Sequence, residues 1–438
     1  MRVTRPTVKP RRLMAQVSRI SFSKLTQKQA ATTAARHEML FAGRMGGARA
    51  SFAFCDLSGL DLAGRNLSDA DFTGAVLEET NMAGAKLESA SFFGADLRRA
   101  NLQGAQLRRA DLRGVCMRGA NLIGADLYEA DLREGAIAEK DRHGDLRLMQ
   151  HDLGPSELPA ALLVSANLER AKMTGVIAMQ ADFTDAVMKS CRLSRANLRQ
   201  ARLSGANLEN ADLTSSNLCG AVLDGAILVG AQMAHAVLDG VDLSTALTDE
   251  PAGRQVAKHE TPVAQLLELH AKWAESDGRE GRPIDLSGMD LRKSGTFAHR
   301  ALTALIAPGA ILYGLDMQGI SLQGSNLAGA DLRATRLAGA DLRGVNFCGA
   351  KLNNADLRDV KLGPLLIADS RLLPARLDGA QARYCDFRGA DLRRISLKEA
   401  DLSYANLSDA DVRGTDISAA ILTGAKLPAH VRNTELAG

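Results

Sequence analysis

The chain has 438 residues, of which 46% are hydrophobic and 4% aromatic, and a formal net charge of +3. This hydrophobic content excludes a wholly disordered chain, and the scarcity of aromatic rings requires a core of leucine and alanine. The charge is unevenly divided, because residues 1–50 carry eleven Lys or Arg and one acid, whereas residues 51–438 carry 43 basic and 50 acidic groups.

The sequence also gives an expectation about the cellular compartment of the protein. No window holds the roughly 18 consecutive apolar residues of a membrane helix, and the N-terminal region lacks the apolar stretch of a secretion signal. Six cysteines are scattered without a CxxC pair, which indicates neither a disulfide framework nor a zinc site. We therefore expect a protein of a bacterial-type cytoplasm.

Residues 1–50 are predicted to form a basic arm followed by a capping helix. Arginine and lysine dominate residues 1–22, which are typical of a mobile arm that could contact nucleic acid or an acidic membrane. A helical pattern covers residues 26–41 and ends near Gly43. His37 lies on this predicted helix.

A five-residue repeat dominates the rest of the chain. A large apolar residue recurs every five positions over residues 52–132, 168–243 and 312–427. These runs contain 57 such positions, and 55 of them are large and apolar. A small residue usually lies two positions earlier, as in Ala95-Asp96-Leu97, so the motif is A-(D/N)-L-x-x.

This period predicts a coiled backbone. It fits neither the 3.6 residues of a helical turn nor the 2.0 of a strand, so the chain must turn a corner every five residues. If each pentapeptide is a short extended segment followed by a tight turn, the large and the small residue both point inward. Stacked coils of this kind pair their backbones like strands and enclose one narrow core.

The repeat resembles that of the pentapeptide-repeat family over about 285 residues. The resemblance implies an all-β fold, a right-handed quadrilateral β-helix with four pentapeptides per coil. At roughly 4.8 Å between strands, an uninterrupted stack would be about 65 to 70 Å long. Bulky residues in the small position, Arg65, Val176, Leu315 and Leu365, predict local swelling of the coils.

Shifts in the register of the repeat divide the chain into segments. The predicted pentapeptide arrays cover residues 51–137, 161–247 and 284–427. An insertion loop at 138–160, a linker with a second capping helix at 248–283 and a tail at 428–438 account for the remainder. Leu148, Leu153, Leu158 and Leu163 already match the register of the second array, so the alternative is that part of the insertion is a degenerate coil.

Helices at the start of an array have a physical purpose, because an open β-helix end would expose apolar side chains and unpaired strand edges. In the linker, Thr261 is the predicted N-cap, Pro262 the first helical residue, and Gly278 the end of the helix. We expect His37, His270 and Trp273 to be structural cap residues that pack on the end of the coils.

The sequence contains no recognisable catalytic or cofactor motif. It lacks a nucleophile paired with a base, a phosphate-binding loop and metal-ligand spacing. His143 and His151 lie near three aspartates but lack the tight spacing of a zinc site. Cys55, Cys191 and Cys385 occupy the small inward position and are predicted to fill the core. We therefore predict a protein that is not an enzyme and binds no cofactor.

Residues twenty apart fall on the same face of successive coils, so the surface can be read from the sequence. Arg98 is placed over Arg118, and Arg113 over Arg133. The candidate interaction surface comprises Arg98, Arg109, Arg113, Arg118, Arg133, Arg383, Arg388, Arg393, Arg394 and Lys398. Acidic residues lie between these cations, so a mixed surface that only maintains solubility is the alternative.

Three functions remain open from the sequence. The first is a non-catalytic scaffold that displays its faces to a protein partner. The second follows from the resemblance, because some pentapeptide-repeat proteins modulate DNA gyrase or topoisomerase by imitating duplex DNA; this requires a strongly negative surface, whereas residues 51–438 carry only −7. The third is attachment to nucleic acid or an anionic membrane through residues 1–50. A homodimer formed through the C-terminal coil is a further prediction.

Overall fold

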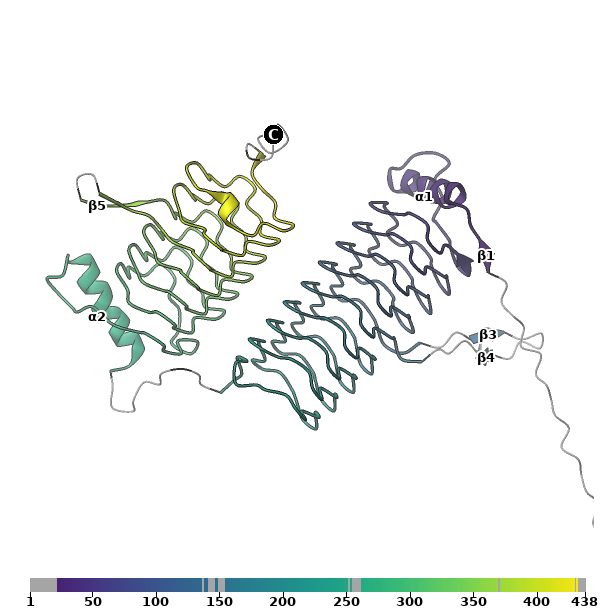
Figure 1. Cartoon of the computed structure of the whole chain (residues 1–438), viewed down its shortest axis with the longest axis horizontal. Helices are drawn as coiled ribbons and strands as arrows, with labels where there is room; N and C mark the ends of the chain where they lie inside the picture. The colour runs from purple at the N-terminus through teal and green to yellow at the C-terminus, as the bar shows by residue number, and fades with distance from the viewer. Residues whose placement is uncertain are drawn as a thin grey trace, which may run out of the picture. The chain divides into compact units, whose positions relative to one another are not determined.

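The computed structural model describes residues 22–135, 138–140, 146–148, 154–250, 253, 261–368, 371–429 and 431 (Figure 1). The chain divides into two compact units, Met1–Glu250 and Pro251–Gly438, which we call unit 1 and unit 2. Residues 1–21 of the basic arm, the cluster around His143 and His151, and residues 432–438 of the tail lie outside the described residues.

Each unit contains a solenoid of stacked coils. Parallel bridges join Asp96 to Cys116 and Asn101 to Asn121, and the same twenty-residue offset recurs along most of the chain. Successive bridges are five residues apart, so each coil of twenty residues is bonded to the next at four places. The result is a β-helix-type solenoid with little helix; its right-handedness stays a prediction from the resemblance.

The polar residues of the motif build the corners. The N–H of Leu97 donates to Cys116 O in the next coil (2.7 Å), and the N–H of Ala100 donates back to Leu97 O (3.1 Å), which closes a turn. The carboxylate of Asp96 accepts from the N–H of Arg98 (3.1 Å) and holds the same turn. The turn requires a positive φ two residues after the leucine, as at Gly104 (64°) and Arg99 (56°).

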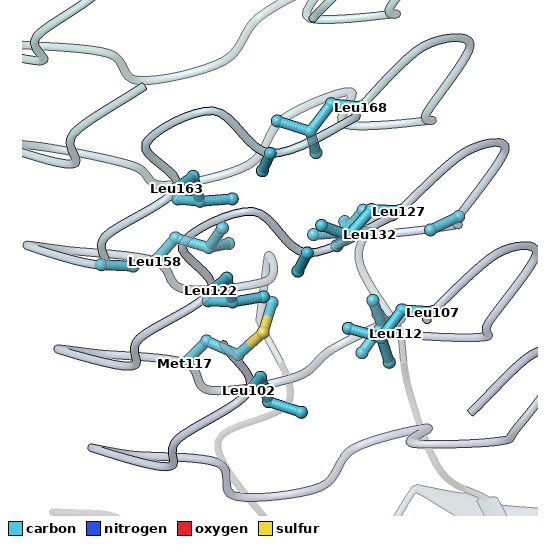
Figure 2. Packing of buried hydrophobic residues seen from close by; sticks show 14 of the residues in the cluster. Leu102, Leu107, Leu112, Met117, Leu122, Leu127, Leu132, Leu158, Leu163 and Leu168 are labelled. Atoms are coloured by element: carbon cyan, nitrogen blue, oxygen red, sulfur yellow. The ribbon is translucent and has the colours of Figure 1, made fainter. Parts of the chain in front are cut away.

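The repeated leucines fill the interior. Leu107, Leu112, Leu122 and Leu127 have no exposed surface, and Figure 2 shows their side chains within the coils. Aromatic residues form part of the same column, because the rings of Phe52, Phe72 and Phe92 stack with centroids 5.0 and 4.7 Å apart. The narrow coils are therefore filled by aliphatic and aromatic side chains, with alanine at the small position.

The first two predicted arrays belong to one solenoid. Glu157 bridges Cys116 and Lys172 bridges Asp131, so the coil after the insertion stacks directly on the coil before it. β3 (Ala138–Lys140) and β4 (Leu146–Leu148) form an antiparallel pair within the insertion. The predicted insertion at 138–160 was too long at its C-terminal end, because Leu158 is fully buried and joins Leu112 and Leu127 in the core (Figure 2).

The third array is interrupted, which the prediction of an unbroken array at 284–427 missed. β5 (Leu365–Ala368) and β6 (Arg371–Leu373) form an antiparallel hairpin. Asn346 bridges Arg376 across thirty residues instead of twenty, so the hairpin adds the length of two pentapeptides. Ile367 and Leu372 keep the five-residue spacing but are 45% and 46% exposed.

Deleting residues 365–374 should therefore preserve the fold of unit 2. The deletion joins Pro364 to Ala375 and restores the five-residue step from Leu362 to Leu377. We expect the melting temperature to change by only a few degrees, because the deletion keeps the buried Ala375 and Leu377 of the coils. Circular dichroism during thermal unfolding measures this. Deleting only residues 365–372 shifts the register, and this control variant should unfold at a clearly lower temperature.

A helix covers the first coil of unit 1. β1 (Ser23–Lys24) pairs in parallel with β2 (Cys55–Asp56), and α1 (Gln27–Phe41) follows. Thr26 caps this helix through a capping box with Gln29. The buried face of α1 presents Ala30, Ala34 and His37 to the end of the coils.

Unit 2 begins in the same way. α2 (Val263–Glu275) buries Leu267 and His270. The prediction of Thr261 as N-cap was wrong, because Pro262 holds that position and no side chain caps the helix. Trp273 is half-buried, with its ring 5.4 Å from that of His270. Near the end of the unit, η1 (Ile417–Ala419) is a short 3-10 helix, and dimerisation through this last coil stays a prediction.

Candidate interaction surface

Arginine and aspartate pair within single pentapeptides on the outer surface. Arg113 Nε donates to Asp111 Oδ1 (2.8 Å) and Arg113 Nη2 donates to Asp111 Oδ2 (2.7 Å). The same two-point pairing between residues i and i+2 recurs on the surface where the motif reads Asp-Leu-Arg or its variant, at Asp96, Asp131, Asp341, Asp356, Asp386, Asp391 and Asp411. The pairs at Asp290 and Asp331 have the same geometry but are largely buried. Such pairs neutralise many surface guanidinium groups locally.

The predicted surface cations of unit 1 are all in ion pairs. Arg98 contacts Asp96 and Glu78, and Arg133 contacts Asp131. Arg109 reaches Glu88 in the preceding coil (2.5 Å). Arg118 reaches Glu157 (2.8 Å) across the insertion. Only Arg109 and Arg113 of this set line the groove described next.

The predicted cations of unit 2 are likewise interleaved with acids. Arg388 pairs with Asp386 (2.6 Å), Arg393 with Asp391 (2.8 Å) and Arg383 with Asp401 (2.5 Å). Lys398 has one weak contact with Glu399 at 3.9 Å. Among the described residues of this set, Arg394 alone has no ion pair. This surface is therefore close to neutral.

A groove of about 620 Å³ lies on the outer surface of unit 1, and its lining contains more basic than acidic residues. We call it the corner groove. Its lining consists of Arg109, Ala110, Asp111, Arg113, Glu129, Asp131, Arg170, Lys172, Ser190 and Arg192. Five of these residues are basic and three are acidic.

Four successive coils build the corner groove. Bridges connect Asp111 to Asp131, Asp131 to Lys172, and Lys172 to Arg192, so these residues form one column. The middle bridge spans the insertion. Sequence reasoning missed Arg170, Lys172 and Arg192, because the offset across the insertion is 41 residues instead of twenty. If the length of the insertion had been known, the regular offset between coils would have put Lys172 and Arg192 in one column with Asp111 and Asp131.

The ion pairs in the corner groove leave positive charge uncompensated. Arg113 Nη2 lies 2.7 Å from Asp111 Oδ2, whereas Arg170 Nε lies 3.3 Å from Glu129 Oε1, so the second ion pair is looser. Lys172 is only loosely paired, 3.9 Å from a carboxylate oxygen of Asp131 that contacts Arg133 at 2.7 Å.

Two further features determine the charge of the corner groove. Burial raises the pKa of Asp131, but hydrogen bonds from Arg133 and the charges of Arg133 and Lys172 lower it overall, so this carboxylate stays ionised and lies between two cations. Arg192 has no ion pair among the described residues and is exposed. Lys172 and Arg192 are thus the cations of the groove with the weakest carboxylate contacts.

The described residues offer little for catalysis. They contain no group of three or more His, Cys, Asp or Glu that could hold a metal ion. Burial raises the pKa of the Cys385 thiol to about 12, so it stays protonated at neutral pH. Cys191 is also buried and Cys55 half-buried. Within the described part of the chain, no helix has the length and apolar character needed to span a membrane.

Comparison with known proteins supports the assignment of the repeat. The family model "Pentapeptide repeats" matches eight times and covers more than half of the chain, at residues 55–92, 90–127, 161–200, 191–228, 206–244, 325–363, 375–414 and 395–428. No curated protein matches.

Several solved structures resemble the chain. One is HetL, a pentapeptide repeat protein from the cyanobacterium Nostoc sp. strain PCC 7120, with 21% identity over 89% of this chain and 92% of that one (TM-score 0.13). Another is Rfr23 from the cyanobacterium Cyanothece 51142, with 25% identity over 35% and 91% (TM-score 0.17). A third is QnrB1, a plasmid-mediated fluoroquinolone resistance protein, with 12% identity over 64% and 94% (TM-score 0.21).

At TM-scores this low, the solved structures carry no argument about function. The family model rests instead on the repeats themselves, which supply the buried leucines and the bridges between coils. The chain belongs to the pentapeptide-repeat family.

Proposed function

We propose that this protein is a non-catalytic interaction module whose corner groove binds an extended acidic segment of a protein partner. The observation that carries the proposal is the excess of cations in the groove, five against three carboxylates, with Arg192 in no ion pair within the described part of the chain. An acidic segment would satisfy Lys172 and Arg192 without breaking the close Arg113–Asp111 pair.

The shape of the groove favours an extended partner. Four stacked coils at roughly 4.8 Å spacing give a column about 15 to 20 Å long. A peptide in extended conformation advances roughly 3.3 Å per residue, so about five residues would span it. Acidic side chains on alternate residues would then face the column.

The structure also bears on the two alternatives. Imitation of duplex DNA requires a dense negative surface, whereas here the repeated Asp–Arg pairs neutralise the carboxylates along the coils. The tether through the basic arm rests on residues 1–21, which lie outside the described residues. Deleting only residues 1–21 tests the tether without removing α1 from the end of unit 1.

A charge-reversal variant tests the proposed groove. We expect Lys172→Glu/Arg192→Glu to weaken binding of a fluorescein-labelled peptide of alternating Glu and Ser at least about tenfold, because it reverses the groove's two least compensated charges. Fluorescence anisotropy with the full chain at low salt measures the affinity. The matched control Lys86→Glu/Arg199→Glu changes the net charge equally outside the groove and should stay within about twofold of the wild type.

Two outcomes would contradict the proposal. Equal weakening in both variants would mean that the peptide responds only to the overall charge. A 20-base-pair DNA duplex that binds more tightly than the peptide, and that loses affinity in the groove variant alone, would assign the groove to nucleic acid instead of an acidic protein.

A further inference from the structure

Both capping helices are fastened by a buried histidine in the same arrangement. In unit 1, the backbone N–H of Ala50 donates to His37 Nδ1 (3.0 Å), and His37 Nε2 lies 2.8 Å from Ser68 O. His37 has no exposed surface. The histidine therefore joins α1 to the chain that enters the first coil and to a turn of that coil.

Unit 2 repeats this arrangement with different residues. The N–H of Ile284 donates to His270 Nδ1 (3.2 Å), and His270 Nε2 lies 3.0 Å from Thr303 O. His270 is also fully buried. The two caps share the histidine, the entering N–H and the turn carbonyl, although their helices differ in sequence.

These contacts fix the protonation state of each ring. Nδ1 accepts a hydrogen bond, so it carries no proton, and Nε2 must carry the proton that is donated to the carbonyl. A second proton would sit on Nδ1 and point at the N–H of Ala50 or Ile284. Protonation of Nδ1 would therefore remove this hydrogen bond, leave two N–H groups that point at each other, and place a positive charge in a buried site.

The nearby charges give little compensation. Around His37, Glu38 is held by Arg65, and the segments packed on the ring also carry Arg49 and Asp69. Around His270, the charged groups are Glu268 and Lys272 on α2, Arg282 and Asp285 beside Ile284, and Arg300 beside the Thr303 turn. The closest ring neighbours of the two histidines are Phe41 and Trp273.

We propose that the cap of unit 2 is a pH-sensitive latch, in which protonation of His270 releases α2 and opens the end of the solenoid to a second copy of the chain. The interface set free is apolar, because Leu267 of α2 belongs to the core of the unit. Release would also expose unpaired strand edges, which pair readily with other chains.

The direction of the pH effect follows from the burial. Burial lowers the pKa of His270, although hydrogen bonds to the backbone at Thr303 and Leu302 oppose the shift. The unfolded or released histidine has a pKa of about 6.5. The latch is thus at full strength above that value and weakens as the pH falls below it, by up to about tenfold in the closing equilibrium per pH unit.

Hydrogen exchange on the full chain tests the latch. Between pH 7.5 and 5.5, we expect the protection factors of α2, corrected for intrinsic exchange, to fall by up to about tenfold per pH unit below 6.5. Peptides from central coils such as 97–116 serve as the internal reference and should not change. Light scattering should show association of chains over the same pH range.

Substitutions of single histidines test which residue carries the pH dependence. His270→Gln removes the titrating group, so α2 should lose its pH dependence at a lower overall protection. His37→Gln alters only the cap of unit 1 and should leave the wild-type response of α2. His235→Gln and His299→Gln replace exposed histidines and should not change α2. Unchanged pH dependence of α2 in His270→Gln would overturn the proposal.

A second measurement does not depend on the variants. Exchange of the imidazole C2 hydrogens, followed by mass spectrometry of the wild type, gives the pKa of His270. We expect this pKa to lie below about 6.5, the ordinary value of a histidine side chain. If it lies at that value or higher, the latch in unit 2 is wrong.

Discussion

Leu357→Ala is expected to lower the free energy of unfolding of unit 2 by about 2 to 5 kcal/mol, whereas Leu372→Ala should change it by less than about 0.5 kcal/mol. Both residues are leucines in the same five-residue register, fifteen positions apart. Leu357 is 1% exposed within a coil, and its truncation leaves a cavity that neighbouring coils cannot fill. Leu372 lies on the exposed face of β6.

Urea unfolding measures this difference. The chain has a single tryptophan, Trp273, and it lies in the cap of unit 2, so its fluorescence reports on that unit. The comparison is between two variants of identical chemistry, which removes differences in side-chain volume. Equal destabilisation by both substitutions would mean that residues 365–373 are a coil and not a hairpin.

Gly281→Ala is expected to detach α2 and to lower the stability of the cap by about 2 to 4 kcal/mol. A Cβ at Gly281 would lie 2.1 Å from the backbone oxygen of Leu269 and 2.8 Å from the nitrogen of Trp273. The φ of Gly281 is also positive, at 71°. Because both clashes are with helix backbone, only movement of α2 can relieve them.

Gly288→Ala is the matched control. Its φ of 66° is similar, but no atom lies within 4 Å of the added Cβ. We expect a cost of about 1 kcal/mol, which reflects the left-handed conformation alone. A red shift of Trp273 emission and loss of hydrogen-exchange protection in α2 measure detachment. If both variants give the same emission and protection, α2 is not packed against the backbone at Gly281.

The sequence predicted most of the coils for a physical reason. Only a backbone that turns every five residues can bury every leucine of the repeat, and this constraint places Leu107 and Leu127 inside without any structure. The role of the carboxylate before the leucine can be predicted as well. The turn leaves the N–H of the residue after the leucine without a backbone partner, and a side chain such as that of Asp96 accepts a hydrogen bond from this N–H in Arg98.

The interruptions could not be predicted from the same constraint. The hairpin lengthens the offset between bridged residues by ten, from twenty to thirty, so Ile367 and Leu372 keep the phase of the repeat although they lie outside the core. At the first insertion, Leu158 matched the register of the second array, but Gly154 and Pro155 just before it indicated a loop. The register shows where an apolar residue recurs but not whether a neighbouring coil covers it.

The candidate site was only partly predictable for related reasons. Arg109 and Arg113 were recognised from their stacking, but Lys172 and Arg192 join them only after the insertion is removed from the count. The cap histidines were assigned to packing from their place on the helices. Their hydrogen bonds depend on how the chain enters the first coil at Ala50 and Ile284, and no local pattern encodes that path.

The central claim is that the coils before and after the insertion form one solenoid, since this alone builds the corner groove. Glu157→Cys tests it, because residue 157 bridges the native Cys116 and bridged neighbours lie within reach of a disulfide. Non-reducing peptide mapping after mild oxidation of the folded chain is the measurement. We predict a Cys116–residue 157 disulfide, and much less crosslink in Ile177→Cys, which lies one coil further away. Absence of the first disulfide, or equal formation of both, would contradict the account.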